Sequence, residues 1–156
     1  MTDSWTPTKV RQLEALLTER DGRILDDLES FRALTTRLIQ RLHFPAGVHG
    51  LHATVPTATR LANRVLLRLE AHGFIARIER RVGGPLRGSA ATTWHLAAAG
   101  ERLLRARRGD PSRRRYVTPS RAFLAHTLAV AEFAVTARES ELAGQLDILE
   151  LDTEPS

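Results

Sequence analysis

The sequence of 156 residues contains no cysteine, a single lysine and a single tyrosine, and each shortage removes a class of protein. Without cysteine there is no disulfide framework, no thiolate metal site and no thiol nucleophile. The only lysine is Lys9, so the glycine-rich stretch GGPLRGS at 83–89 lacks the lysine of a phosphate-binding P-loop. No run approaches the roughly 18 uncharged apolar residues of a membrane span, and the first residues, MTDSWTPTKV, lack the pattern of a secretory signal. We therefore expect a soluble, cytoplasmic protein.

No arrangement of catalytic residues is recognisable in the sequence either. A nickase or relaxase needs a nucleophilic tyrosine beside a metal-binding histidine cluster, but the only tyrosine, Tyr116, lies in an arginine-rich segment. His49 and His52 stand three residues apart without nearby acids, which is not a typical metal-ligand pattern. Glu150 and Asp152 resemble the acidic strand of a metal-dependent nuclease, yet no lysine follows them. We predict a protein that is not an enzyme and that uses no metal and no cofactor.

The charge is small in total and uneven along the chain. The formal net charge is +5, but residues 57–119 carry fourteen arginines against four acids, which gives +10. Residues 120–156 carry two arginines against seven acids, which gives −5. The basic block favours a polyanionic partner, because arginine suits phosphate and guanine recognition. A G+C-rich genome would produce the same preference for arginine over lysine, so that preference alone does not identify the partner.

Capping residues and apolar spacing predict six helices and one hairpin. Helices are expected to open at Thr6-Pro7, at Thr18 with a capping box to Asp21, and at Thr35 or Thr36. Further helices are expected at 57–72, at 96–107, and from Thr118-Pro119 to about residue 142. Alternating apolar residues predict strands at 74–82 and 92–96 with a glycine-rich tip between them, and 146–151 is a candidate for another strand.

Three helices, a two-stranded hairpin and a helix follow one another in the order of a winged helix-turn-helix. We expect a mainly α fold with a small β-hairpin, a winged helix-turn-helix with flanking N- and C-terminal helices. The expected divisions are an N-terminal helical extension at 1–17, the winged helix-turn-helix DNA-binding domain at 18–108, a basic linker at 109–119, and an apolar helix with an acidic C-terminal segment at 120–156.

The helix expected at 57–72 has one apolar side and one arginine-rich side. Its expected buried residues are Leu61, Val65, Leu66 and Leu69. Arg60, Arg64 and Arg68 recur every four residues and form one stripe opposite the leucines. Like charges at this spacing repel, and a polyanion would relieve the repulsion. The alternative interpretation is a basic helix face that only contacts solvent.

The helix and the hairpin supply the candidate DNA-binding residues. Threonine and asparagine near the start of the helix can read base edges or hold phosphates, and an arginine at the hairpin tip can enter a minor groove. The candidates are Thr57, Thr59, Arg60, Asn63, Arg64, Arg68, Arg80, Arg81 and Arg87. The arginines between 105 and 115 form a further cluster that would bind phosphates without reading sequence, or would only be solvated.

The stretch 123–137 is apolar almost all round, so it must be covered by its own domain or by a second copy of the chain. We expect a homodimer, with packing on the first helix as the alternative. The candidate dimerisation residues are Phe123, Leu124, Leu128 and Phe133. His126, inside this stretch, is expected to be a buried or interface histidine and not a metal ligand.

Five segments carry a resemblance to a known family: LTERDGRILDDL at 17–28, LTTRLIQRLHF at 34–44, RLANRVLLRLEAHGFIARI at 60–78, WHLAAAGERLL at 94–104 and FLAHTLAVAEFAV at 123–135. The first four resemble many winged helices. With the fifth, the sequence resembles the replication-relaxation family, winged-helix proteins of actinobacterial plasmids and integrative elements.

The resemblance implies a role in plasmid replication or DNA relaxation through duplex binding. We therefore expect a sequence-specific double-stranded DNA-binding protein of a mobile element, associated with the nucleoid or the plasmid. Two alternatives stay open. One is a dimeric winged-helix repressor of transcription, and the other is a protein-interaction module that docks a replication or conjugation protein.

Overall fold

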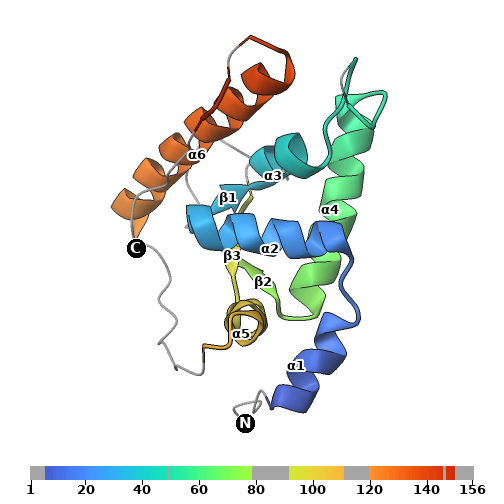
Figure 1. Ribbon diagram of the computed structural model, residues 1–156, viewed down its shortest axis with the longest axis vertical. Helices are drawn as coiled ribbons and strands as arrows, with labels where there is room; N and C mark the ends of the chain where they lie inside the picture. The colour runs from blue at the N-terminus through green and yellow to red at the C-terminus, as the bar shows by residue number, and fades with distance from the viewer. Residues whose placement is uncertain (1–5, 49, 79–91, 111–119, 146, 150–156) are drawn as a thin grey trace.

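The computed structural model describes residues 6–48, 50–78, 92–110, 120–145 and 147–149, which form six helices and three short strands (Figure 1). The elements are α1 (Pro7–Glu14), α2 (Glu19–Phe31), β1 (Leu34–Thr35), α3 (Thr36–His43), α4 (Val55–Ala71), β2 (Ile75–Arg77), β3 (Thr93–Leu96), α5 (Ala98–Arg107) and α6 (Arg121–Leu142). The described fold is thus mainly helical with a small antiparallel sheet, as the sequence predicts.

Hydroxyl side chains start most of the helices. Thr6, Thr18 and Thr35 each accept the backbone N–H of the third residue on, and Asp21 completes a capping box with Thr18. These three predicted starts are confirmed. The reason is that each cap is a local hydrogen bond, which the sequence specifies without help from the rest of the fold.

Three predicted helix starts, those of α4, α5 and α6, are wrong by two residues. Helix α5 begins at Ala98 and not at residue 96, because Leu96 belongs to strand β3. Helix α4 begins at Val55, because the Thr54 hydroxyl accepts the N–H of Thr57 and the following proline is tolerated in the first turn. Helix α6 begins at Arg121 with Ser120 as its cap, and not at Thr118-Pro119. For α4 and α6, a second hydroxyl residue close to the predicted one makes the capping hydrogen bond.

The strands form one three-stranded antiparallel sheet in the order β1-β3-β2. Ile75 pairs with Leu96 as the predicted hairpin requires, while the predicted tip and its flanks at 79–91 lie outside the described residues. The extra strand, β1, pairs Leu34 with Trp94. The indole N–H of Trp94 also donates to the Thr36 hydroxyl at 2.8 Å, which ties the sheet to the start of α3.

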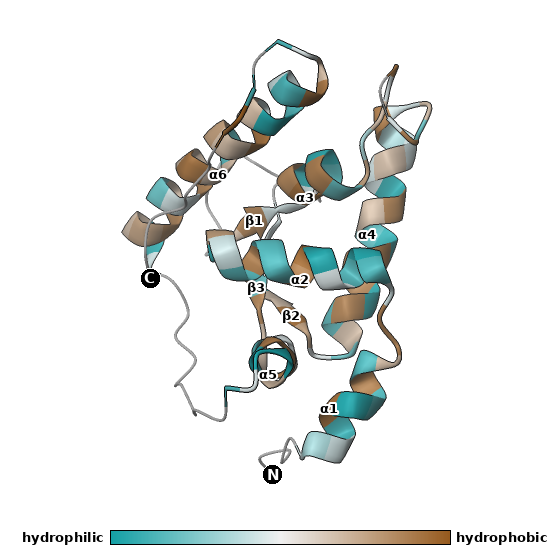
Figure 2. Cartoon of the chain, in the orientation of Figure 1, coloured by the Kyte–Doolittle hydropathy of each residue, from teal (hydrophilic) through white to brown (hydrophobic). Residues whose placement is uncertain are grey.

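The core lies between α2, α3, α4 and the sheet, where apolar sides of the helices meet (Figure 2). Helix α4 turns Ala58, Ala62, Leu66 and Leu69 fully inward. The predicted inward residues Leu61 and Val65 are only half-buried, so the buried face of α4 is rotated toward the alanines. Small side chains at these positions allow the α4 backbone to approach α3 closely.

Helix α6 lies on the far side of the domain from α1 (Figure 1). It packs on α2, α3 and β1, whereas α1 packs on α5. The alternative that α6 is covered by the first helix is therefore wrong. Residues 147–149, within the predicted last strand, form no strand. Among the described helices, none is both long and apolar enough to cross a membrane.

Candidate nucleic-acid interface

The outward face of α4 carries two exposed arginines. Arg60 and Arg64 lie one turn apart on the side of the helix opposite its buried residues. The only carboxylate of α4, Glu70, is already bound by Arg77 at 2.8 Å. Within the described part of the chain, Arg64 has no hydrogen bond or ion pair, so its charge meets only solvent. This face can therefore offer positive charge to an external anion.

A short chain of hydroxyl groups leads from the start of α4 to Arg60. The Thr54 hydroxyl donates to the Thr57 hydroxyl at 3.0 Å, and the Arg60 guanidinium donates to the same Thr57 oxygen at 3.4 Å. These contacts direct Arg60 toward the N-terminal end of the helix. The helix dipole at that end also favours an anion.

Arg68 differs from the other two arginines of the predicted stripe. Its Nη2 donates to Asp21 Oδ1 at 2.7 Å and Oδ2 at 2.8 Å, and its Nη1 donates to the Leu16 carbonyl at 3.3 Å. Asp21 is only 1 % exposed and is the residue that closes the capping box of α2. The expectation of three free arginines is thus corrected to two, because Arg68 fastens α4 to the turn between α1 and α2.

The remaining predicted residues of α4 flank this face. Thr57, Thr59 and Asn63 are each half-buried. Thr59 borders a hollow of about 470 Å³ whose lining also includes Arg37 and Val55. Their side chains stand beside the two arginines at the edges of the outward face, so a role in contacting nucleic acid stays a prediction.

The hairpin arginines divide into one described residue and three others. Arg77, on β2, binds Glu70 and lies over the Trp94 ring at 5.2 Å, so it braces the sheet against α4. The predicted site residues Arg80, Arg81 and Arg87 fall within 79–91 and lie outside the described residues. Their role in binding is a prediction that the structure leaves open.

The described part of the predicted phosphate-binding cluster is engaged with the protein's own acids. Arg105 pairs with Glu101 at 2.5 Å, Arg107 with Glu14 at 2.9 Å and Arg108 with Glu29 at 2.5 Å. The Arg107 and Arg108 pairs join the end of α5 to α1 and α2, whereas the Arg105–Glu101 pair lies within α5. Arg113, Arg114 and Arg115 belong to the segment 111–119, which lies outside the described residues.

A comparison with models of protein families places most of the chain in one of them. The model described as replication-relaxation matches residues 25–147, which run from the middle of α2 past the end of α6. The chain belongs to the replication-relaxation family. This confirms the resemblance seen in the sequence, and the family's description suggests a role in replication or relaxation. No curated protein and no solved structure matches the chain.

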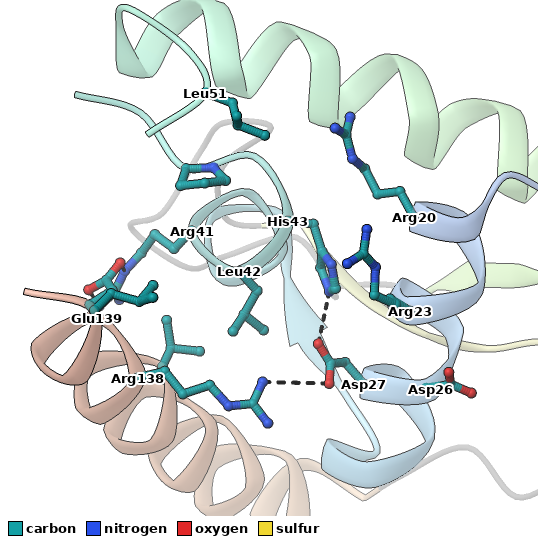
Figure 3. Close-up of a pocket in the computed structure, with 13 residues that line it drawn as sticks. Arg20, Arg23, Asp26, Asp27, Arg41, Leu42, His43, Leu51, Arg138 and Glu139 are labelled. Atoms are coloured by element: carbon teal, nitrogen blue, oxygen red, sulfur yellow. Dashed lines mark hydrogen bonds and ion pairs between the residues drawn. The ribbon is translucent and has the colours of Figure 1, made fainter. Parts of the chain in front are cut away.

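The part shared with the replication-relaxation family includes an ion-pair network between α2, α3 and α6, around a hollow of about 420 Å³ (Figure 3). His43 and Arg138 both point at Asp27, with Nε2 2.8 Å from Oδ2 and Nη1 3.8 Å from Oδ1. Arg41 binds Glu139 at 2.6 Å and also binds Glu132.

The ion pairs of this network shift the pKa values of two of its members and hold α6 on the domain. Hydrogen bonding from Arg41 holds the pKa of Glu139 below its usual value, and hydrogen bonding to Glu139 raises the pKa of Arg41. The Arg138–Asp27 and Arg41–Glu139 pairs therefore hold α6 on α2 and α3. Sequence reasoning missed this network, because Arg41 and Glu139 are 98 residues apart and no local pattern links them.

The described residues also bear on metal binding. They contain no group of three histidine, aspartate or glutamate side chains placed to hold a metal ion. His52 stacks on Phe44 with ring centroids 6.2 Å apart, while His49 lies outside the described residues. In the described part of this replication-relaxation protein, the candidate site is the outward face of α4 that carries Arg60 and Arg64.

Proposed function

We propose that this member of the replication-relaxation family is a winged-helix protein that binds double-stranded DNA with α4, and that it acts in plasmid replication or relaxation or in its control. The observation that carries the proposal is the outward face of α4, where Arg60 and Arg64 have no acid partner among the described residues. Exposed guanidinium groups on one helix face suit the phosphates and guanine edges of a duplex.

The arrangement of the elements supports the proposal. Helix α2, strand β1, helices α3 and α4, and strands β2 and β3 follow in the order of a winged helix-turn-helix. In that architecture the last of the three helices enters the major groove, and the hairpin reaches an adjacent groove or the backbone. Helix α4 is the last of the three helices α2, α3 and α4. The sequence between β2 and β3 includes Arg80, Arg81 and Arg87.

The candidate residues have different roles in DNA binding under this proposal. Arg60 and Arg64 contact phosphates or guanine, and Thr57 and Asn63 at the edges of the face contact backbone or adenine. The three arginines of the hairpin supply further contacts. Arg68 holds the helix in place through Asp21 and does not contact DNA.

A second candidate function is a protein-interaction module of a replication or conjugation complex. The exposed aromatic residues of α6, Phe123 at 47 % and Phe133 at 73 % exposed, favour a protein contact. A dimeric repressor would combine this contact with DNA binding. Binding to random duplex at moderate salt separates the candidates, because a pure interaction module leaves DNA unbound.

Fluorescence anisotropy with a labelled duplex tests the proposal. If each arginine contributes about 1–3 kcal/mol, the double variant Arg60→Ala/Arg64→Ala raises the Kd by at least about thirtyfold. The matched control is Arg11→Ala/Arg23→Ala, which removes the same charge from exposed positions on α1 and α2. We expect the control to change the Kd by less than about threefold. Equal losses in the two double variants would contradict the assignment of α4 as the DNA-binding helix.

A further inference from the structure

Among the described residues, one side of helix α6 packs on the rest of the domain and the opposite side is exposed. Thr127, Ala131, Ala134 and Val135 are buried against the rest of the domain. Of the predicted dimerisation residues, Leu128 packs against the core and Leu124 is half-buried, while Phe123 and Phe133 are exposed. A surface for a partner must therefore use the opposite side of the helix.

The exposed side of α6 is mostly apolar. Its residues recur at the spacing of one helix face and are all exposed: Ala122, Ala125, His126, Ala129, Glu132, Phe133 and Thr136. From 122 to 136 the only charged residue is Glu132, although 26 % of the whole chain is charged. Glu132 is bound by Arg41 of α3. Apolar colouring accordingly runs along most of α6 in Figure 2.

This face has a large residue at one end and small residues at the other. Ala122, Ala125, His126 and Ala129 stand at i, i+3, i+4 and i+7, which is the outline of a hole that accepts one side chain from a facing helix. Phe133, 73 % exposed, is one turn further along and projects from the same face. A helix that carries both a hole and a matching knob is complementary to an antiparallel copy of itself.

We propose that two copies of this chain associate through α6, antiparallel, about a two-fold axis at Ala129. In this register Phe133 of each copy enters the alanine-lined hole of the other, and the two Ala129 residues meet on the axis. Small side chains there let the helix backbones approach closely. Phe123, 47 % exposed at the edge of the face, extends the apolar contact.

Charges at the edge of the face agree with the same register. Arg121 and Glu139 lie 18 residues apart, which is five full turns, so they share one edge of α6. The two-fold axis brings Arg121 beside Glu139 of the partner subunit. Within the described part of the chain, Arg121 has no ion pair. Glu139 keeps an exposed side-chain fraction of 44 % while it binds Arg41, so it is accessible to a second cation.

The size of the exposed side of α6 determines the expected affinity of the dimer. A helix of 22 residues is about 33 Å long, and a pair of such helices has an interface near the lower limit of about 1,000 Å² for a specific dimer. We expect a micromolar Kd. A different protein partner is less suited to this face, because no charge in its centre would orient or select a dissimilar surface.

Sedimentation equilibrium without DNA tests the dimer, so its outcome is separate from that of the DNA-binding proposal. The wild-type chain is expected to dimerise with rising concentration, and Ala129→Glu is expected to raise the dimer Kd at least tenfold by placing two like charges on the axis. Ala106→Glu, at an exposed position on α5, is the matched control and leaves the Kd unchanged. Circular dichroism checks that both variants are folded.

Cross-linking tests the register, since the chain has no cysteine of its own. Under mild oxidation Ala129→Cys is expected to form a covalent dimer, because a disulfide needs Cα atoms about 4.4–6.8 Å apart, and Ala106→Cys is expected to stay monomeric. A wild-type chain that remains monomeric at about 100 μM overturns the proposal. A dimer that resists Ala129→Glu and forms no Ala129→Cys cross-link overturns it as well.

Discussion

At the scale of single residues, the arginines of α4 show how one residue type at one spacing serves two purposes. Arg64 is exposed and has no hydrogen-bond or ion-pair partner among the described residues. Arg68, one turn further on, donates two hydrogen bonds to Asp21. The sequence predicts a single stripe because the spacing is regular. The difference comes from Asp21, which is 47 residues away in the chain and which no periodicity on α4 can reveal.

Stability measurements distinguish these two purposes. Arg68→Ala is expected to lower the free energy of unfolding by roughly 2–4 kcal/mol, because Asp21 stays buried without its ion partner. Arg64→Ala changes this free energy by less than about 0.5 kcal/mol, since it removes no contact with the described residues. Urea denaturation of both variants provides the comparison. If the two variants are equally stable, Arg68 does not fasten α4 as described.

His95 makes stability depend on pH. It is buried in the central strand β3, and burial lowers its pKa below the usual 6.5, while a hydrogen bond with the Arg77 backbone acts in the opposite direction. The unfolded chain takes up a proton near pH 6.5 but the folded chain does so only at lower pH, so the free energy of unfolding falls as the pH drops below about 6.5.

Replacing His95 isolates this effect. In His95→Gln the loss of stability between about pH 7.5 and about pH 5 is expected to be smaller than in the wild type, because the group that titrates differently is gone. Denaturant unfolding at several pH values measures it. The other histidines are common to both proteins, so identical pH profiles would mean that His95 is not the group responsible.

At the scale of elements, the sequence predicts those features that local interactions determine. The starts of α1, α2 and α3 follow from hydroxyl caps, and the strands β2 and β3 follow from alternation. Strand β1 has only two residues, too few for any alternation, and exists because Leu34 pairs with Trp94. The rotation of α4 toward Ala58 and Ala62 depends on its packing partner, which the pattern of that helix alone does not contain.

Two glycines inside helices differ in what surrounds them. At Gly100, near the start of α5, an added Cβ would collide with the Phe74 carbonyl oxygen, which belongs to backbone. At Gly22, in α2, an added Cβ would meet only the end of the flexible Arg107 side chain, at 3.3 Å. Close packing of α5 on the sheet therefore depends on Gly100 and not on Gly22.

Alanine at each position tests this difference. Gly100→Ala is expected to lower the free energy of unfolding by about 1–3 kcal/mol through overpacking. Gly22→Ala is expected to leave it unchanged or to raise it by up to about 1 kcal/mol, since alanine favours helix more than glycine does. Thermal unfolding of the two variants is sufficient. A stable Gly100→Ala protein would show that α5 can move away from Phe74 at little cost.

At the scale of the whole molecule, ion pairing decides how much of the basic block faces outward. In the described part of that block, five arginines form ion pairs with acids of the same chain: Arg68, Arg77, Arg105, Arg107 and Arg108. Counting residues in the sequence gives the charge of the block but not this pairing. Arg60 and Arg64 have no such acid among the described residues, so this part of the basic block offers their charge on α4 to an external anion.

The salt dependence of affinity for duplex DNA tests most directly whether this charge meets phosphates. If five to seven arginines contact the backbone, the logarithm of the binding constant falls with the logarithm of salt concentration at a slope of about −4.5 to −6. In Arg60→Ala/Arg64→Ala the slope becomes shallower by about 1.8, or about 0.9 for each lost contact. A wild-type slope near zero, or a slope that the double variant leaves unchanged, would contradict the account.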